Sequence, residues 1–139
     1  MTSVEKTDKI LLANTLFQKG YNCAQAVAGA FCQEMGLPLD TVTRLASGFG
    51  GGIGGRRETC GAVSGMVMVY SALCGYDDPE AKEEKQDVYT QIKQVTQLFE
   101  ETYQTIQCAD LIVRGADSQE GRPCTCYVER CTEILCDFL

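Results

Sequence analysis

The sequence predicts an all-α protein, a single-domain helical bundle of about five main helices. Apolar side chains recur at helical spacing along most of the chain, and residues that favour helix starts and ends separate these segments. A length of 139 residues suits one hydrophobic core. We therefore expect residues 1–139 to form one domain, with a glycine-rich loop before its central helix.

The first two predicted helices are defined by their end residues. Thr2 and Glu5 form a capping box for a helix that continues to about residue 19, and Gly20 ends it. Asn22 is a good cap for a second helix that continues to about residue 35. Cys23 is then the first residue of this second helix.

A short third helix and a glycine-dense loop are expected next. Residues 38–46 predict the helix, with Val42 and Leu45 directed inward. Residues 47–55 contain six glycines, which allow close backbone approach at an entropic cost in the folded state. Such a loop beside a cysteine suggests a site, although a plain connector is the alternative.

The central helix is predicted over residues 60–74. This segment is apolar nearly all round, so we expect it to be buried, with Cys60 as its first residue and Thr59 as its cap. Gly61 and Gly65 are four residues apart and form an edge on which another backbone can pack closely.

The second half of the chain predicts a long helix, a short helix and a final helix. The long helix starts near Pro79 and continues to about residue 106, and Cys108 starts a short helix or turn. Residues 115–121 are expected to form a polar loop. Pro123 is expected at the first position of the last helix, beside Cys124.

The overall charge excludes one class of partner. The net charge is −7 and the sequence pI is about 4.5, so no basic stripe is available to bind nucleic acid. The sequence shows no signal-peptide pattern and no apolar run long enough to span a bilayer. We therefore expect a cytoplasmic protein that is not integral to a membrane.

Nine cysteines and the absence of histidine direct the functional interpretation. An odd number of cysteines cannot pair completely within the chain, and in a reducing cytosol this number indicates metal or redox chemistry. Without histidine, triad hydrolases and imidazole metal sites are excluded.

Four cysteines stand out because each lies at a predicted helix N-terminus. The free N–H groups and the positive dipole end of a helix favour a thiolate over a thiol. If the helix starts converge, they form a pocket that holds negative sulfur. The candidate redox or metal-binding residues are Cys23, Cys60, Cys108 and Cys124. Core packing is the interpretation for Cys32, Cys74, Cys131 and Cys136, and Cys126 is ambiguous.

The glycine loop is expected to assist these thiols. Its backbone N–H groups are candidates for binding an anion, in the manner of a nest, and Arg56 and Arg57 add positive charge. The loop lacks the lysine and the preceding strand of a nucleotide-binding loop. The candidate cofactor-binding residues are Gly50, Gly51, Gly52 and Gly61.

Several segments together resemble one known family. They are residues 20–27 (GYNCAQAV), 47–52 (SGFGGG), 60–65 (CGAVSG), Cys108 and 124–128 (CTCYV). In combination they are similar to the redox-active protein family named for its C_GCAxxG_C_C cysteine motif, over nearly the whole chain. The resemblance implies a small helical prokaryotic protein with a redox-related role, sometimes associated with transporters. It places the four family cysteines on Cys23, Cys60, Cys108 and Cys124, and it assigns no role to the other five.

Three functional hypotheses follow. In the first, the chain is a thiol–disulfide redox protein that acts on a partner protein or a small thiol, with Cys60 or Cys23 attacking. In the second, the same four thiolates hold an iron–sulfur cluster or zinc. In the third, the cysteines pack in the core of a structural or partner protein. Whether the chain is an enzyme is left open.

Overall fold

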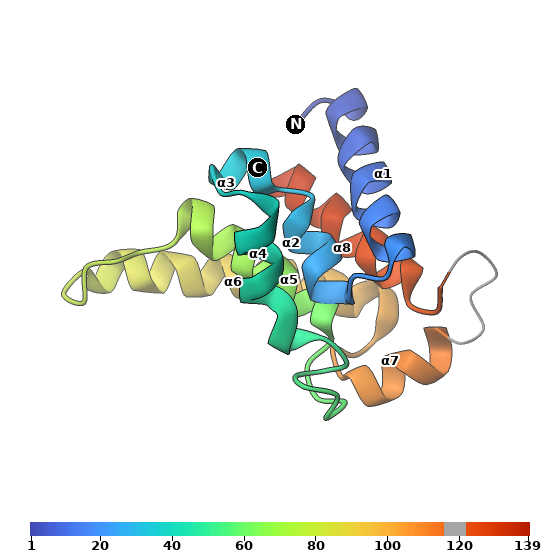
Figure 1. The fold of residues 1–139 in the computed structure, drawn as a ribbon. Coiled ribbons are helices and arrows are strands. Elements are labelled where there is room, and N and C mark those ends of the chain that lie inside the picture. The colour runs from blue at the N-terminus through green and yellow to red at the C-terminus, as the bar shows by residue number, and fades with distance from the viewer. Residues whose placement is uncertain (116–121) are drawn as a thin grey trace.

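The structure is a computed structural model that describes residues 1–115 and 122–139 (Figure 1). Within these residues it is helical, with no β-strand, which confirms the all-α prediction. The prediction of about five main helices is too low, since this part of the chain contains eight α-helices. They are α1 (Ser3–Lys19), α2 (Cys23–Gly29), α3 (Cys32–Met35), α4 (Leu39–Ala46), α5 (Gly61–Cys74), α6 (Lys82–Tyr103), α7 (Cys108–Gly115) and α8 (Thr125–Phe138), with a 3-10 turn η1 (Ser47–Phe49).

Helix α5 lies at the centre and packs closely against α2. A Cβ atom added at Gly65 would lie 2.8 Å from the carbonyl oxygen of Ala24, and one at Gly61 would lie 3.3 Å from Cβ of Cys23. Only glycine lets the two helix backbones approach so closely. The glycine edge predicted from the sequence is therefore the surface on which α2 packs.

We expect the Gly65→Ala substitution to destabilise the protein by about 1–2 kcal/mol, although alanine usually stabilises a helix interior. The clash with the carbonyl of Ala24 has no flexible side chain to absorb it. Gly48→Ala is the control, because nothing lies within 4 Å of a Cβ at that position. Denaturant unfolding of both variants measures the difference, and equal stabilities would contradict the close packing of α2 on α5.

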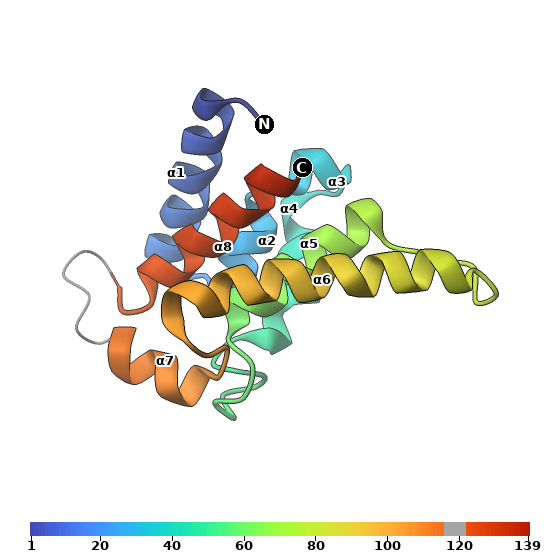
Figure 2. The ribbon, with the colours of Figure 1, turned by 180° about the vertical axis from the view of Figure 1, so that it is seen from behind.

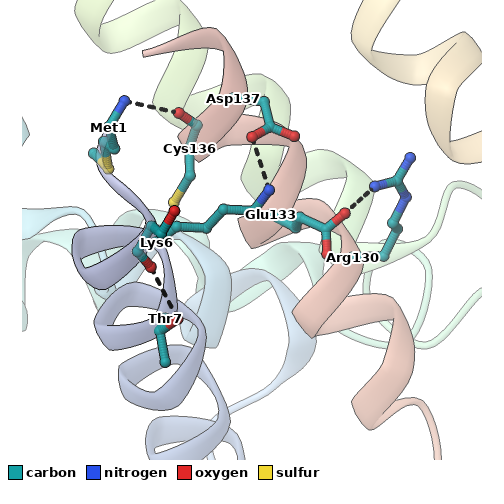
Figure 3. Close-up of polar contacts among 8 residues, drawn as sticks. Met1, Lys6, Thr7, Arg130, Glu133, Cys136 and Asp137 are labelled. Atoms are coloured by element: carbon teal, nitrogen blue, oxygen red, sulfur yellow. Dashed lines mark hydrogen bonds and ion pairs between the residues drawn. The ribbon is translucent and has the colours of Figure 1, made fainter.

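Helices α1 and α8 pack side by side and bring the two chain ends close together (Figure 3). Lys6 Nζ lies 2.8 Å from Oδ1 of Asp137, and the amino group of Met1 donates to the carbonyl of Cys136 at 3.4 Å. The ion pair of Lys6 with Asp137 is exposed, so it contributes little to stability. At the other end of α1, Phe17 is buried and reaches the candidate site.

Helix α6 lies across α5 and α8 and extends beyond them at its N-terminal end (Figure 2). Val95 and Phe99 are its buried residues. It is shorter than predicted at both ends, since it begins at Lys82 and not near Pro79, and Gln104 adopts a left-handed conformation (φ 68°) that ends it after Tyr103. In the described part of the chain no helix is both long enough and apolar enough to cross a membrane.

The predicted helix over residues 23–35 is two short helices. The chain leaves helical geometry at Phe31 (φ −113°), whose side chain is fully buried. Lys9 Nζ donates to the carbonyl of Ala30 at 3.0 Å and lies 2.7 Å from Oε1 of Glu34. Lys9 thus satisfies a carbonyl that the helix break leaves free, which local sequence preference could not reveal.

Two predictions of inward side chains are wrong. Cys74 is exposed, because the last turn of α5 lies outside the core and Ala72 beside it is exposed too. Leu45 is also exposed, and α4 instead buries Val42 and Ala46. Most of the polar loop predicted at 115–121 lies outside the described residues.

Candidate functional site

One cavity of about 330 Å³ is lined by all four helix-start cysteines. They come from the starts of α2, α5, α7 and α8, which are far apart in the sequence. The convergence expected from the sequence is therefore present. The lining residues are Phe17, Asn22, Cys23, Gly51, Gly52, Arg57, Cys60, Gly61, Cys108, Leu111, Ile112, Arg122, Pro123, Cys124 and Tyr127.

A capping box fixes Cys23 as the first residue of α2, as predicted. The Asn22 side chain accepts from the N–H of Gln25 at 2.9 Å, and the Gln25 side chain accepts from the N–H of Asn22 at 3.0 Å. Asn22 also donates to the carbonyl of Ser47 at 3.0 Å. These bonds connect the start of α2 to the segment that leads into the glycine loop.

A short antiparallel pairing joins the segments that carry Cys60 and Cys108. Thr59 and Gln107 form an isolated β-bridge, and the N–H of Cys60 donates to the carbonyl of Ile106 at 2.7 Å. The N–H of Cys108 donates to the carbonyl of Glu58. The bridge therefore places the starts of α5 and α7 next to each other.

Cys60 is the N-cap of α5, whereas the sequence predicted it as the first helical residue after a Thr59 cap. Thr59 is used in the bridge to Gln107 instead. Cys108 starts α7 as predicted. The hydroxyl of Tyr127 on α8 donates to the carbonyl of Leu111 at 2.6 Å, so α7 and α8 are held together beside the cavity.

The glycine loop packs directly against Cys108. Gly52 has a φ of +71°, and a Cβ there would lie 2.7 Å from Cβ of Cys108 and 2.6 Å from the nitrogen of Glu58. Gly51 and Gly52 accept hydrogen bonds from the N–H groups of Arg57 and Glu58. Those two N–H groups therefore shape the loop and are not free to bind an anion.

The four predicted cofactor-binding glycines divide into two groups. Gly51, Gly52 and Gly61 line the cavity, whereas Gly50 is not a lining residue. Gly50 instead packs on Asn22, since a Cβ at Gly50 would lie 2.5 Å from the side-chain amide nitrogen of Asn22. Gly50, Gly52 and Gly61 permit close approach to the segments that carry Cys23 and Cys108, whereas Gly51 packs on Gly55 within the loop.

Cys124 is the N-cap of α8 and adopts a left-handed conformation, with φ 77°. Pro123 precedes it and is outside the helix, so the prediction that this proline begins the helix is wrong. A non-glycine residue in this conformation costs about 1–2 kcal/mol, and such backbone strain is concentrated at functional sites.

Arg122 is a cavity residue that the sequence reasoning missed. Its Nη1 donates to the carbonyls of Phe17 at 2.6 Å and Tyr21 at 2.8 Å. Its guanidinium carbon lies 4.1 Å from the centre of the Phe17 ring. The only sequence feature that pointed to Arg122 as a site residue was its position two residues before Cys124. That position does not predict the contact of Arg122 with Phe17 of α1.

Arg57 supplies the second cation. Its Nη1 lies 3.7 Å from the sulfur of Cys108, so a negative charge that develops on this sulfur has a guanidinium beside it. Arg56, the other arginine predicted to act here, does not line the cavity. It pairs with Glu58 at 3.2 Å, and both side chains are mostly exposed.

Burial opposes ionisation of three of the four thiols. It raises the pKa of Cys23 to about 12 and the pKa values of Cys60 and Cys124 to about 11. The backbone N–H groups of Ala62 and Val63 lower the pKa of Cys60, but less than burial raises it. This reverses the direction expected from the helix starts alone, and the three thiols are protonated at neutral pH.

The neighbouring thiols reinforce this effect. A charge on Cys60 raises the pKa of Cys23, and a charge on Cys108 raises the pKa values of Cys60 and Cys124. Arg122 acts in the opposite direction on Cys23 and Cys124. The cavity therefore disfavours several thiolates at once.

The remaining cysteines divide by exposure. Cys131 and Cys136 are buried in the core as predicted, Cys32 and Cys126 are half-buried, and Cys74 is exposed. Among residues 1–115 and 122–139, no three cysteine or acidic side chains are grouped closely enough to hold a metal ion. The four cavity thiols thus surround a space without forming a compact ligand set.

The raised pKa of Cys60 predicts a pH-dependent stability. Above pH 9 the unfolded chain loses this proton, whereas the folded protein retains it until about pH 11. The free energy of unfolding of the reduced protein should therefore fall as the pH rises from 9. Cys60→Ala should remove about 1 kcal/mol of that loss between pH 8 and pH 10.

Cys74→Ala is the control for this measurement, because the Cys74 thiol is exposed. Denaturant unfolding across the pH range under reducing conditions gives the slopes. If the Cys60 and Cys74 variants lose stability with pH equally, the burial of the Cys60 thiol is contradicted.

The fold and site define a small all-helical protein with four cysteines around one recessed cavity. The model of the family described as "Putative redox-active protein (C_GCAxxG_C_C)" matches residues 21–138. The chain belongs to this family. Neither the curated proteins nor the solved structures that were compared include a significant match to it.

Proposed function

We propose that the chain is a thiol redox protein whose cavity cysteines cycle between dithiol and disulfide. The observation that carries this proposal is the lining of one cavity by Cys23, Cys60, Cys108 and Cys124. Nine free cysteines suit a reducing compartment, and we propose the cytoplasm. The family description agrees with redox chemistry in general.

In this proposal Cys108 is the attacking thiol. The guanidinium of Arg57 lies 3.7 Å from its sulfur, and among the described residues no other cavity thiol is hydrogen-bonded to a cationic side chain. Cys23 and Cys60, the attacking thiols expected from the sequence, are protonated because burial raises their pKa values to about 12 and about 11. The Cys108 thiolate attacks one sulfur of a substrate disulfide, forms a mixed disulfide and releases one substrate thiolate.

Cys124 then resolves the mixed disulfide. Burial raises the pKa of Cys124 most and the charge of Cys108 comes next, and only the second cause disappears once Cys108 is in a disulfide. Arg57 and Arg122 continue to lower that pKa. The Cys124 thiolate attacks the Cys108 sulfur, a protein disulfide forms and the second substrate thiolate leaves, so that the substrate gains the two electrons that the two protein thiols lose.

Cys23 and Cys60 are the second pair in this proposal. Cβ of Cys23 lies 3.3 Å from the position of a Cβ on Gly61, the residue next to Cys60. Of the charged groups around Cys23, Cys60 has the largest effect on its pKa. We assign them to a second disulfide of the same cavity.

An iron–sulfur cluster is the second candidate, and one observation favours it. Four thiols from separate elements surround a space of about 330 Å³, and charges on Cys60, Cys108 and Cys124 oppose the ionisation of their neighbours. A cluster held by four cysteines would neutralise that repulsion. Zinc has less support, since it needs a compact tetrahedral set of ligands.

Thiol, metal and sulfide analysis of one anaerobic preparation separates the two candidates. The thiol redox proposal predicts that, after mild reduction and denaturation, all nine cysteines are free, with no stoichiometric iron, zinc or acid-labile sulfide. Iron and sulfide in fixed proportion to the chain, with a visible absorption band, would replace it with the cluster.

A further inference from the structure

We infer that the cavity accepts a small anionic disulfide, and that Arg57 and Arg122 bind its negative groups. This inference rests on the proposed dithiol chemistry and names the substrate class of the same site. It is carried by the size of the cavity, the depth of its thiols and the charges of its described lining residues.

The thiols are too recessed for the disulfide of a folded protein. Cys60 is 4% exposed and Cys108 is 8% exposed. Both open into a cavity of about 330 Å³, which is the size of a small-molecule site. A disulfide within a folded chain could reach the Cys108 sulfur only if the helix starts separated, whereas a free disulfide of low molecular weight can enter.

The cavity is positive although the protein is acidic. The chain has a net charge of −7, yet the described lining residues include two arginines and no aspartate or glutamate. Cys23, Cys60 and Cys124 add no negative charge at neutral pH. An anion approaching this cavity therefore meets two positive side chains on its described lining.

Both arginines are exposed residues whose guanidinium groups contact other residues at the cavity. Two carbonyl groups and the Phe17 ring hold Arg122, and Arg57 lies against Cys108. Apolar side chains form much of the remaining wall: Phe17, Leu111, Ile112, Pro123 and Tyr127. Two positive side chains beside an apolar wall suit a ligand with a short carbon chain that carries an anionic group and a sulfur atom.

The reaction with such a compound balances without another reactant. The thiols of Cys108 and Cys124 reduce one molecule R–S–S–R. One protein disulfide forms, one substrate S–S bond breaks, and two molecules of R–SH carry away the two protons. The product thiol leaves the cavity when its anionic group dissociates from Arg57.

Three small disulfides of similar length test the charge preference. They are 3,3′-dithiodipropionate (anionic), 2-hydroxyethyl disulfide (neutral) and cystamine (cationic), and insulin is the protein disulfide. The measurement is the rate at which each oxidises the reduced protein at low ionic strength. We expect the anionic compound to react about tenfold faster than the neutral one, with the cationic compound and insulin slower still.

Arg57→Gln is expected to reduce the anionic-to-neutral rate ratio about fivefold, and Arg122→Gln is expected to act in the same direction. Arg56→Gln is the matched control, because Arg56 pairs with Glu58 outside the cavity. It should leave the ratio unchanged, and added salt should lower the ratio in the parent protein.

The outcomes separate this inference from the function on which it rests. If neutral or cationic disulfides, or insulin, react as fast as the anionic compound, the substrate class is overturned while the dithiol function stands. If Arg56→Gln lowers the ratio as much as Arg57→Gln, the cavity arginine has no specific role. If none of the four disulfides oxidises the cavity thiols, the dithiol function itself fails.

Discussion

Replacing Cys108 with serine is expected to slow oxidation of the protein by a small disulfide about 100-fold or more. Serine keeps the size of the side chain but removes the sulfur that lies beside Arg57. A hydroxyl at this position cannot form the mixed disulfide, and the protonated thiols of Cys23 and Cys60 are poor substitutes. Rapid-quench alkylation followed by mass measurement gives the rate.

Cys74→Ser is the control for the loss of one cysteine, because this thiol is exposed and lies outside the cavity lining. It should be oxidised at the rate of the parent protein. Cys124→Ser should still react once and then stop at the mixed disulfide. Full oxidation of the Cys108 variant at the parent rate would show that another thiol attacks.

The Gly52→Ala substitution is expected to destabilise the protein by about 3 kcal/mol or more. The new Cβ would overlap Cβ of Cys108, at 2.7 Å, and the nitrogen of Glu58, at 2.6 Å. Alanine is also strained at the φ of +71° that Gly52 adopts. Either the loop or the start of α7 must move, so the substitution should also displace Cys108 and slow its oxidation.

Gly54→Ala is the control that isolates the contribution of the contact between Gly52 and Cys108. Gly54 lies in the same loop with a similar φ of +57°, but nothing lies within 4 Å of a Cβ there. It should cost only about 1–2 kcal/mol, the strain of the backbone conformation alone. If the two alanine variants unfold at the same denaturant concentration, the loop does not pack on Cys108.

Local patterns predicted the starts of α1 and α2 well, the starts of α5, α6 and α8 less well, and the helix interruptions poorly. The capping boxes at Thr2 and Asn22 and the glycine that ends α1 are present as expected, because each depends on neighbouring residues. The break at Phe31 depends on Lys9 from another helix, which no local pattern contains. Helix α6 ends because Gln104 adopts a left-handed conformation, which is rare for residues other than glycine.

The members of the site were more predictable than its electrostatics. Helix-start position selected four cysteines that line one cavity, and glycine density selected the loop that packs on Cys108. The direction of the thiol pKa shifts was not predictable, because desolvation depends on how many elements cover a sulfur. Arg122 was missed for a similar reason, since its partners Phe17 and Tyr21 lie about a hundred residues earlier in the chain.

Redox equilibration with peptide mapping tests the central claim most directly. The protein is equilibrated with dithiothreitol at a series of reduced-to-oxidised ratios, quenched with acid, alkylated and digested. We predict that Cys108 and Cys124 lose their free thiols together, at one midpoint, and are recovered as one cross-linked pair of peptides, while Cys74 remains alkylated throughout. The claim is contradicted if Cys108 and Cys124 stay free across the whole series, or if each is oxidised separately and never joined to the other.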